Sequence, residues 1–275
     1  MMAGMPALPD WSPDDIDPQI PSSARMYDYV LGGFTNFEVD RKLADWVQQT
    51  MPEVAQGARD NRAFLRRLVG FLVQEAGIDQ FLDLGSGIPT AGNVHEIAQR
   101  LRPGTRVVYV DIDPVAVSAS RQLLADNPDA TAIRADLTDV EEILAAPEVA
   151  GLLDLSRPVA VLLVSVLHFV PESADPAAGI ARLREAMAPG SYLAISHFTD
   201  EGREGDAQRI VAMSRQTPTT TTPRSRAQIE ALFDGFTVLE PGMVDVSTWR
   251  PEEPADGAPA SFSGWYCGVG VLAGE

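Results

Sequence analysis

One short stretch constrains the fold of this chain more than any other. Residues 80–89 read QFLDLGSGIP, and their apolar first half is typical of a buried parallel strand. This strand leads into Gly85-Ser86-Gly87, where the missing glycine side chains let a ligand approach the backbone closely. A helical pattern follows over residues 93–101. The order of strand, glycine turn and helix predicts the nucleotide-binding corner of a doubly wound sheet.

The residues around this turn narrow the choice of nucleotide. The dinucleotide fingerprint has a glycine three residues after Gly87, where this chain has Thr90, and no Gly-Lys-Ser/Thr follows as in a P-loop. Asp83, two residues before Gly85, would repel a pyrophosphate but can hold an amino group. Residues 83–87 resemble the first motif of class I S-adenosylmethionine (SAM) methyltransferases, in which the glycine turn, here Gly85, Ser86 and Gly87, accommodates the methionine part and the ribose. The alternative is a plain tight turn after a strand.

The length and the net charge of the chain limit which folds and which partners are possible. The chain has 275 residues, long enough for one large α/β domain, and 45% of them are hydrophobic, which supplies a full core. Its formal net charge is −18, from 39 acidic and 21 basic residues, and no basic run stands out. Such a field opposes loose binding to nucleic acid, so we expect no nucleic-acid partner.

Cysteine usage and the apolar stretches bear on location. The single cysteine, Cys267, rules out an intrachain disulfide and fits a reducing cytoplasm. The first residues lack the basic start and apolar segment of a signal peptide. The longest apolar stretch, residues 158–170, is too short to span a bilayer. We therefore expect a cytoplasmic protein without a membrane partner; a homo-oligomer is compatible with the sequence, which does not determine the oligomeric state.

The chain before the glycine turn divides into an arm and a helical cap. Residues 1–21 are rich in proline and acids, with little apolar periodicity, and are interpreted as a flexible arm. Helical patterns follow over residues 22–31, 36–49 and 52–76, the first with a serine cap. Because these helices precede the first strand, residues 22–77 are predicted to form an N-terminal cap on the core, which spans residues 78–275.

Strands and helices alternate through that core. After the first strand, further strands are expected at residues 106–111, 130–134, 159–164, 191–196, 236–239 and 265–272. Helices are expected between them at residues 114–126, 140–149 (interrupted by Pro147), 175–187, 206–215 and 225–233. The predicted fold class is α/β: one class I methyltransferase Rossmann-like sheet, mostly parallel with a final antiparallel strand, plus the N-terminal helical cap.

Carboxylates follow three successive strands. Asp111 ends the second strand, 24 residues after Gly87, where a carboxylate can accept both ribose hydroxyls; Ile112 beside it is a further cofactor candidate. After the third strand, Asp136 is expected to accept from the exocyclic amine of adenine, while the backbone N–H of Leu137 donates to the ring. A cationic ligand with an amine, a ribose and an adenine needs all three carboxylates. Solvated strand ends are the alternative.

Polar residues after the fourth and fifth strands are candidates for the chemistry. Ser165 and His168 follow the fourth strand and His197 follows the expected fifth, so all three should border the site. Histidine suits general-base work near neutral pH, so His168 and His197 are the catalytic candidates. A polar rim or a helix cap is the alternative for both. Three histidines and one cysteine offer no metal-ligand spacing, and we expect no metal.

The segment before the core has an unusual composition for a structural helix. Residues 22–37 combine two tyrosines, a glycine pair and Asn36. Tyr27 can place an aromatic face near a sulfonium, Gly33 permits close backbone approach, and Arg62 on the next long helix can pair with a carboxylate. We predict that this segment is a lid over the SAM pocket, lined by Tyr27, Gly33, Asn36 and Arg62. The alternative is a helix packed on the sheet edge.

These residues together resemble a known family, the S-adenosyl methyltransferase family long catalogued as a domain of unknown function. The similarity runs from about Ser23 to Leu272, and its motifs are residues 24–33, 36–37, 61–66, 81–90, 93–96, 107–114, 158–170, 233–236, 240–242 and 249–251. It implies a class I fold with SAM at the glycine turn, but no particular substrate. Members commonly carry a basic residue after the glycine pair, where this chain has Phe34-Thr35.

Three functions are compatible with this sequence. The leading hypothesis is a SAM-dependent methyltransferase acting on a small molecule by in-line attack on the sulfonium methyl. The second is a SAM-binding regulatory protein without catalysis, which the lack of an unmistakable base keeps open. The third is an NAD-dependent oxidoreductase, against which Thr90 and Asp83 argue. The methyl acceptor, the attacked atom and the need for a base are not determined by the sequence.

Overall fold

The computed structural model describes residue 13 and residues 16–90, 92–215, 217–251 and 262–274. Most of the predicted arm (1–21) lies outside these described residues, as do residues 252–261.

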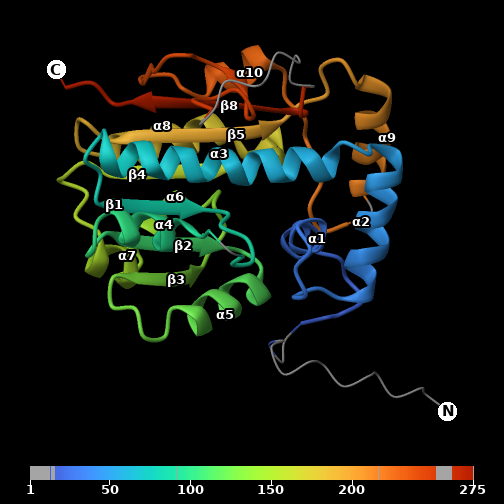
Figure 1. Ribbon diagram of the computed structural model, residues 1–275, viewed down its shortest axis with the longest axis horizontal. Helices are drawn as coiled ribbons and strands as arrows, with labels where there is room; N and C mark the ends of the chain where they lie inside the picture. Colours follow the sequence, from blue (N-terminus) through green and yellow to red (C-terminus); the bar gives the residue numbers. More distant parts are fainter. Residues whose placement is uncertain (1–12, 14–15, 91, 216, 252–261, 275) are drawn as a thin grey trace.

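One mixed sheet organises the described chain (Figure 1). Its strands are β1 (Gln80–Leu84), β2 (Arg106–Asp111), β3 (Ala130–Arg134), β4 (Ala160–Val164), β5 (Tyr192–Phe198), β6 (Thr237–Val238), β7 (Val244–Asp245) and β8 (Trp265–Val271). They are ordered β3-β2-β1-β4-β5-β8-β6, and β7 also pairs with β8. Strands β1 to β5 pair in parallel, whereas β8 is antiparallel to β5, β6 and β7. The predicted fold class is confirmed; the short β7 was not expected.

Helices cover both faces of the sheet. They are α1 (Ser23–Val30), α2 (Glu38–Thr50), α3 (Val54–Gln74), α4 (Val94–Leu101), α5 (Pro114–Leu123), α6 (Val140–Ala145), α7 (Pro147–Leu152), α8 (Pro176–Ala186), α9 (Glu204–Ser214) and α10 (Arg226–Ala231), with 3-10 turns η1 (Leu167–Phe169) and η2 (Glu172–Ala174). The predicted interruption at Pro147 separates α6 from α7, because proline has no N–H to continue a helix.

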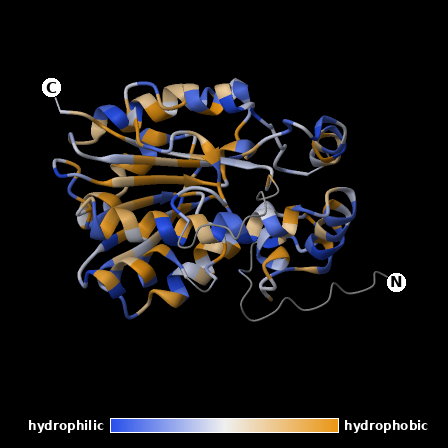
Figure 2. Cartoon of the chain, turned by 45° about the horizontal axis from the view of Figure 1, so that its top comes forward, coloured by the Kyte–Doolittle hydropathy of each residue, from blue (hydrophilic) through white to orange (hydrophobic). Residues whose placement is uncertain are grey.

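The strands supply two apolar layers because successive side chains of a strand point to opposite faces. In β1, Phe81 packs with Leu68 and Leu72 of α3 on one face. Its neighbour Leu82 belongs to the apolar cluster on the other face, which also contains Ile180 of α8 and Ile229 of α10. Figure 2 shows mainly hydrophobic strands between helices that carry both hydrophobic and hydrophilic residues.

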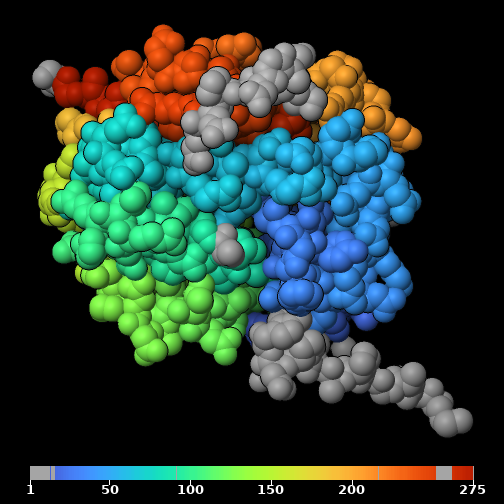
Figure 3. All heavy atoms as spheres, in the orientation of Figure 1, coloured from blue at the N-terminus to red at the C-terminus, as the bar shows by residue number. Residues whose placement is uncertain are grey.

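The N-terminal helices serve two different purposes. Helix α3 runs along the sheet and belongs to its core, so the predicted cap is continuous with the core (Figure 1). Helices α1 and α2, with α9, gather beyond the carboxyl ends of the parallel strands, and Figure 3 shows the N-terminal helices (blue) packed directly against the green part of the core. No helix in the part of the chain that the structure describes is both long and apolar enough to cross a bilayer.

Candidate active site

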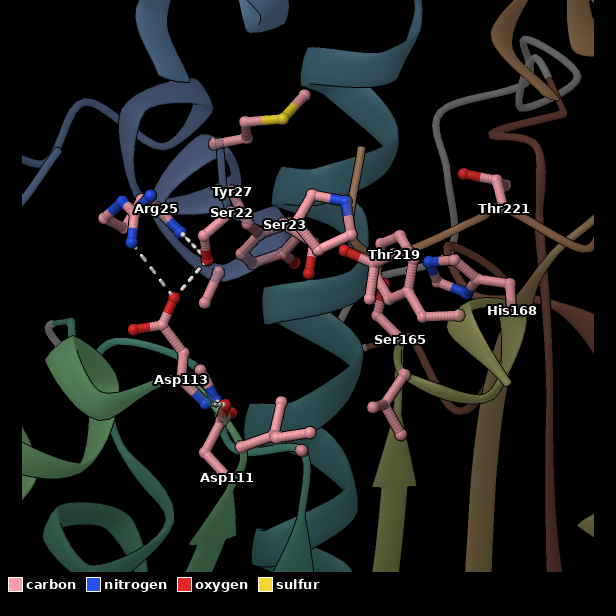
Figure 4. A pocket seen from close by; sticks show the side chains of 18 of the residues that line it. Ser22, Ser23, Arg25, Tyr27, Asp111, Asp113, Ser165, His168, Thr219 and Thr221 are labelled. Carbon is pink, nitrogen blue, oxygen red and sulfur yellow. Dashed lines mark hydrogen bonds and ion pairs between the residues drawn. The ribbon is translucent and has the colours of Figure 1, made fainter. Parts of the chain in front are cut away.

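A cavity of about 870 Å³ lies between the strand ends and these helices. Its walls come from the turns after β1, β2, β3 and β4, from η1, from helices α1, α2, α3 and α9, and from residues 217–221 (Figure 4). A pocket of this size is in the range that holds small-molecule ligands, about 300–1,000 Å³. The structure thus places the site where ligands bind in open α/β sheets.

The glycine turn has the conformation that its sequence predicts. Gly85 and Gly87 have φ values of +71° and +67°, which residues with a side chain rarely adopt. A Cβ on Gly85 would lie 2.1 Å from Val166, so this glycine is required by packing. A Cβ on Gly87 would meet nothing within 4 Å, and Ser86 and Gly87 line the cavity, so ligand atoms can reach the backbone there.

Asp111 is held in place by the backbone around it. Its two carboxylate oxygens accept from the N–H of Gly87 at 2.7 Å and from that of Asp113 at 2.9 Å. Burial raises the pKa of Asp111 to about 6, although these two hydrogen bonds lower it. Ile112, next to it, lines the cavity with a largely exposed side chain. The predicted ribose carboxylate is therefore fixed at the cavity wall.

Asp83 is a buried carboxylate at the cavity wall. Its side chain is 7% exposed, lines the cavity, and makes no hydrogen bond or ion pair with any residue that the structure describes. Burial raises its pKa to about 7; nearby Arg62 lowers it and Asp111 raises it further. Buried carboxylates are normally paired, so Asp83 lacks a cationic or hydrogen-donating group that a ligand can supply.

We expect SAM to bind more weakly in acid. A bound cation favours the ionised form of Asp83, whose charge is lost as the pH falls through its pKa of about 7. The charged or titratable groups near Asp83 are Arg62, Asp111 and Tyr109. One required ionisation at that pKa predicts a loss of roughly 25-fold in affinity from about pH 7.5 to about pH 5.5. Calorimetric titration of SAM at both pH values checks this, with Asp83→Asn as the variant that loses the dependence on Asp83. Equal affinity at the two pH values would contradict it.

Tyr27 and Arg62 line the cavity as predicted. The Tyr27 hydroxyl donates to the Ala58 carbonyl and accepts from Asn61, both at 3.1 Å, so its ring is anchored to α3. Arg62 donates to the Gly92 carbonyl at 2.9 Å. Asn61 was missed as a site residue, although it stands beside Arg62 in one of the motifs that carry the family resemblance.

Asn61 belongs to a buried polar chain behind the cavity. Its side-chain oxygen accepts from the Ser196 hydroxyl at 2.6 Å, and the Ser196 oxygen accepts from the Ser165 N–H at 2.9 Å. Ser165 lines the cavity with φ +59°, and its hydroxyl accepts from Trp265 at 3.2 Å. These bonds fix the turn after β4 to α3 and β8.

Gly33 and Asn36 do not line the cavity, which corrects the expectation for both. The Asn36 amide donates to Asp28 at 2.9 Å and to the Gly33 carbonyl at 3.0 Å. A Cβ on Gly33 would lie 1.9 Å from an Asp28 carboxylate oxygen. The glycine is therefore needed for a turn that closes around the buried Asp28 carboxylate, and a ligand is not required to explain it.

Arg25 is a site residue that the sequence did not single out. It is 3% exposed and pairs with Asp40 at 2.8 Å and with Asp113 at 3.4 Å (Figure 4). The Ser22 hydroxyl donates to the same Asp113, whose backbone N–H holds Asp111. The start of α1 is thereby tied to the ribose corner. The only sequence signal was the place of Arg25 in the N-terminal motif.

The predicted lid can be tested by deletion. Removing residues 1–37 takes away α1, which contributes Tyr27 and the ion pair to Asp113, but leaves α3 in the core. We expect a folded protein, judged by circular dichroism, whose SAM affinity is at least about tenfold weaker, a loss of about 1.4 kcal/mol. A folded truncation that binds SAM as tightly as the full chain would rule the lid out.

Asp136 and Leu137 lie at the cavity, after β3. One oxygen of the exposed Asp136 carboxylate accepts from the N–H and the hydroxyl of Thr138, at 2.9 and 2.7 Å. This local turn orients the carboxylate and leaves its second oxygen without a hydrogen bond among the described residues. Contact with adenine stays a prediction for both residues.

The two candidate histidines have different surroundings. His168, in η1, lines the cavity and is 4% exposed. The Phe198 N–H donates to its Nδ1 at 3.4 Å, so Nε2 carries the proton of the neutral ring, and Nε2 makes no hydrogen bond with any described residue. Burial, followed by the charges of His197 and Arg224, lowers the pKa of His168 well below its usual value, so the ring is neutral at physiological pH.

His197 does not follow the fifth strand but lies inside it, fully buried and away from the cavity wall, which corrects the expectation that it borders the site. Arg224 donates to its Nε2 at 2.9 Å, so its Nδ1 carries the proton and donates to the Phe198 carbonyl at 2.6 Å. Burial lowers the pKa of His197 to about 3. In this structure His197 is a neutral acceptor for a buried arginine.

Arg224 was missed by sequence reasoning, because it stands in a polar stretch without periodicity. It is 2% exposed and donates to Glu172 at 2.7 Å and to the carbonyls of Leu167 and Val170 at 2.8 and 2.9 Å. These bonds brace the turn that carries His168.

The fold and the site define a class of protein. The strand order, the antiparallel strand beside β5, and the glycine turn with carboxylates after successive strands are those of a class I SAM methyltransferase. The sequence model of the family described as "S-adenosyl methyltransferase" matches residues 9–273, and the chain belongs to this family. It is accordingly a SAM-dependent methyltransferase.

Solved structures agree with this assignment. A candidate methyltransferase from Thermobifida fusca YX is 40% identical, with a TM-score of 0.91 over 97% of this chain and 100% of that one. A DUF574 family protein from Streptomyces avermitilis MA-4680 is 38% identical, with a TM-score of 0.88 over 93% and 98% of the two chains. An O-methyltransferase family protein from Burkholderia thailandensis, 15% identical with a TM-score of 0.52 over 84% and 63%, shares the fold. The curated proteins contain no match.

Proposed function

We propose that this methyltransferase transfers the methyl group of SAM to a small-molecule acceptor held in the 870 Å³ cavity. The observation that carries the proposal is Asp83, a buried carboxylate without a partner among the described residues. The ammonium of the SAM methionine part would supply the missing positive charge. The formal net charge of −18 disfavours a nucleic-acid acceptor.

The remaining lining residues have roles that follow from their chemistry. Gly85, Ser86 and Gly87 permit close backbone approach, and Asp111 would accept the ribose hydroxyls. Asp136 and the Leu137 N–H would meet the adenine edge, with Ile112 as an apolar contact. Arg62 would pair with the methionine carboxylate, Tyr27 would lie near the sulfonium, and Ser165 would border the ligand.

Bound SAM supplies a methyl group on a positively charged sulfur, which is already activated for transfer. The protein must hold the attacking atom in line with that methyl group and exclude water. Helices α1, α2 and α9, which close the cavity opposite the strand ends, are suited to both tasks. His168 is the candidate acid–base residue, and the Nε2–H of its neutral ring would donate a hydrogen bond to the acceptor.

Two measurements test this proposal. Calorimetry with SAM, S-adenosylhomocysteine (SAH) and NAD should detect the first two ligands and not NAD. Turnover of methyl-labelled SAM with a panel of metabolites should place the label in a small molecule. Binding of NAD without SAH would overturn the proposal, and SAH binding without any transfer would favour the non-catalytic alternative.

A further inference from the structure

The cavity has two halves of different chemistry. The charged side chains described at its wall all stand between Asp17 and Asp136, before or within α1, on α3, or at and just after the ends of β1 to β3. None of the described lining residues contributed by α2, η1, β5, α9, β8 or residues 217–221 carries a charge, and we call this part the acceptor half. Figure 4 shows Arg25 and Asp113 on one side of the cavity and His168 and Thr221 on the other.

The acceptor half is mostly apolar and contains several aromatic rings. Its apolar side chains include Val47, Phe169, Phe198, Ile210, Met213 and Trp265. The rings of Phe198 and Trp265 lie 5.3 Å apart between centroids, and the His168 ring lies 4.3 Å from that of Phe169. An ionic group placed in this half would lose its hydration without meeting an opposite charge of the protein, so an uncharged ligand is favoured there.

Two hydroxyl groups of the acceptor half are engaged by the chain itself. The Ser214 hydroxyl donates to the Val211 carbonyl at 2.9 Å, and the Thr217 hydroxyl donates to the Ser214 carbonyl at 2.7 Å. A hydroxyl has a single proton to donate, so neither side chain has a donor left for a ligand.

His168 has a donor that the protein does not use. The Phe198 N–H donates to its Nδ1, so the proton of the neutral ring lies on Nε2, which can donate a hydrogen bond but cannot accept one. The side chain is 4% exposed, and no hydrogen bond joins Nε2 to the residues that the structure describes. Figure 4 shows the ring extending from its 3-10 turn toward the other labelled lining residues. A buried N–H without a partner is unfavourable, so a ligand that brings a lone pair to Nε2 is favoured.

We propose that the acceptor of the methyl transfer inferred above is an uncharged, mainly apolar molecule with a carbonyl oxygen that accepts a hydrogen bond from the Nε2–H of His168. The assignment rests on the proposed function and names its substrate class. His168 thereby selects the acceptor and orients it in the acceptor half.

A carbonyl group meets both requirements of this half at once. Its oxygen is uncharged, accepts a hydrogen bond, and carries no proton that would oppose the Nε2–H. A carboxylate also accepts, but its charge would remain unpaired among the uncharged lining residues. An ammonium group has no lone pair to offer the N–H. The aromatic side chains favour a planar ring next to the carbonyl, and Met213 can adapt to its shape.

Three probes with the same ring system separate these requirements. β-Acetylnaphthalene carries a carbonyl, β-ethylnaphthalene an alkyl group in its place without a lone pair, and β-naphthoate a negative charge. Each is titrated into the full chain saturated with SAH. We expect the acetyl compound to bind at least about fivefold more tightly than the ethyl compound, which leaves the buried N–H unpaired. We expect naphthoate to bind at least about tenfold more weakly than the acetyl compound.

His168→Phe tests whether this N–H is the group that recognises the carbonyl. The variant keeps an aromatic ring but removes the donor, so it should lose the preference for the acetyl over the ethyl compound. The comparison of the three probes on the original chain decides the proposal even if this variant does not fold. Nuclear magnetic resonance of isotope-labelled histidine checks the tautomer directly, and a proton on Nδ1 of neutral His168 would overturn the proposal.

The outcomes distinguish this inference from the proposed function. If SAH binds but the ethyl compound or naphthoate binds as tightly as the acetyl compound, the substrate class is wrong while SAM binding stands. The same holds if the acetyl compound does not bind, or if folded His168→Phe keeps the full preference for it. A chain that does not bind SAH at all refutes the proposed function itself.

Discussion

Replacing His168 with alanine is expected to lower kcat by on the order of 10²–10⁴-fold, the usual contribution of a positioned acid–base residue. His168 is the histidine that lines the cavity, and its Nε2 has no hydrogen bond to any described residue. Because no cofactor role is assigned to it, the affinity for SAM should stay within about twofold of the original. The rate of methyl transfer from labelled SAM to the acceptor identified in the metabolite panel, together with SAM titration, measures both quantities.

His197→Gln is the matched control for this prediction. A glutamine oxygen can still accept from Arg224, so the variant keeps the bond that holds Arg224 beside η1. We expect it to retain kcat, since His197 lies away from the cavity wall. Because the lowered pKa keeps His168 neutral, its own titration should not reduce the wild-type rate between about pH 6 and pH 9. Wild-type rates for His168→Ala across that range would show that His168 has no acid–base role.

Asp111→Ala is expected to weaken SAM binding by about 1.5–3 kcal/mol, roughly 10- to 150-fold, the range for hydrogen bonds to a charged group. The backbone N–H groups of Gly87 and Asp113 hold this carboxylate at the wall of the cavity, ready to accept from two ribose hydroxyls. Titration calorimetry with SAM and SAH measures the loss, and circular dichroism checks that the variant is folded.

Asp126→Ala provides the control for charge. It removes the same charge from an exposed position that does not line the cavity, so SAM affinity should be unchanged. An Asp111→Ala protein that binds SAM as tightly as this control would show that Asp111 does not hold the ribose.

Much of the fold could be predicted because its signals are local. Strands β2 and β3 begin and end at the predicted residues, since buried parallel strands are short apolar runs bounded by polar residues. The glycine turn and Asp83, Asp111 and Asp136 were also placed at one cavity by sequence alone. Parallel strands bring their carboxyl ends to the same edge, so a chain-order argument suffices there.

The error at His197 has a different origin. Strand β5 was expected to end at Ser196 but continues to Phe198, because β8 pairs with it through His197 opposite Tyr266 and Phe198 opposite Trp265. The length of a strand at its end is set by its partner, and that partner lies about seventy residues further along the chain. No property of residues 191–198 themselves contains this information.

The errors at Gly33 and Asn36 arose because their partner was not considered. A glycine pair beside polar residues is compatible with a ligand turn or with a turn around a buried carboxylate. In the folded chain, the carboxylate of Asp28, five residues before Gly33, lies inside this turn, so the second explanation is the correct one.

The sequence by itself determined the cofactor half of the site, whose residues stand at strand ends or in the turns after them. Only the tertiary structure decided which histidine faces the cavity and how apolar the rest of the cavity wall is. That part of the wall is assembled from α2, η1, β5 and α9, segments that are distant in the chain and carry no shared motif. Their side chains become neighbours only through packing, so their combined chemistry, an uncharged and mostly apolar wall that includes His168, has no local signature in the sequence.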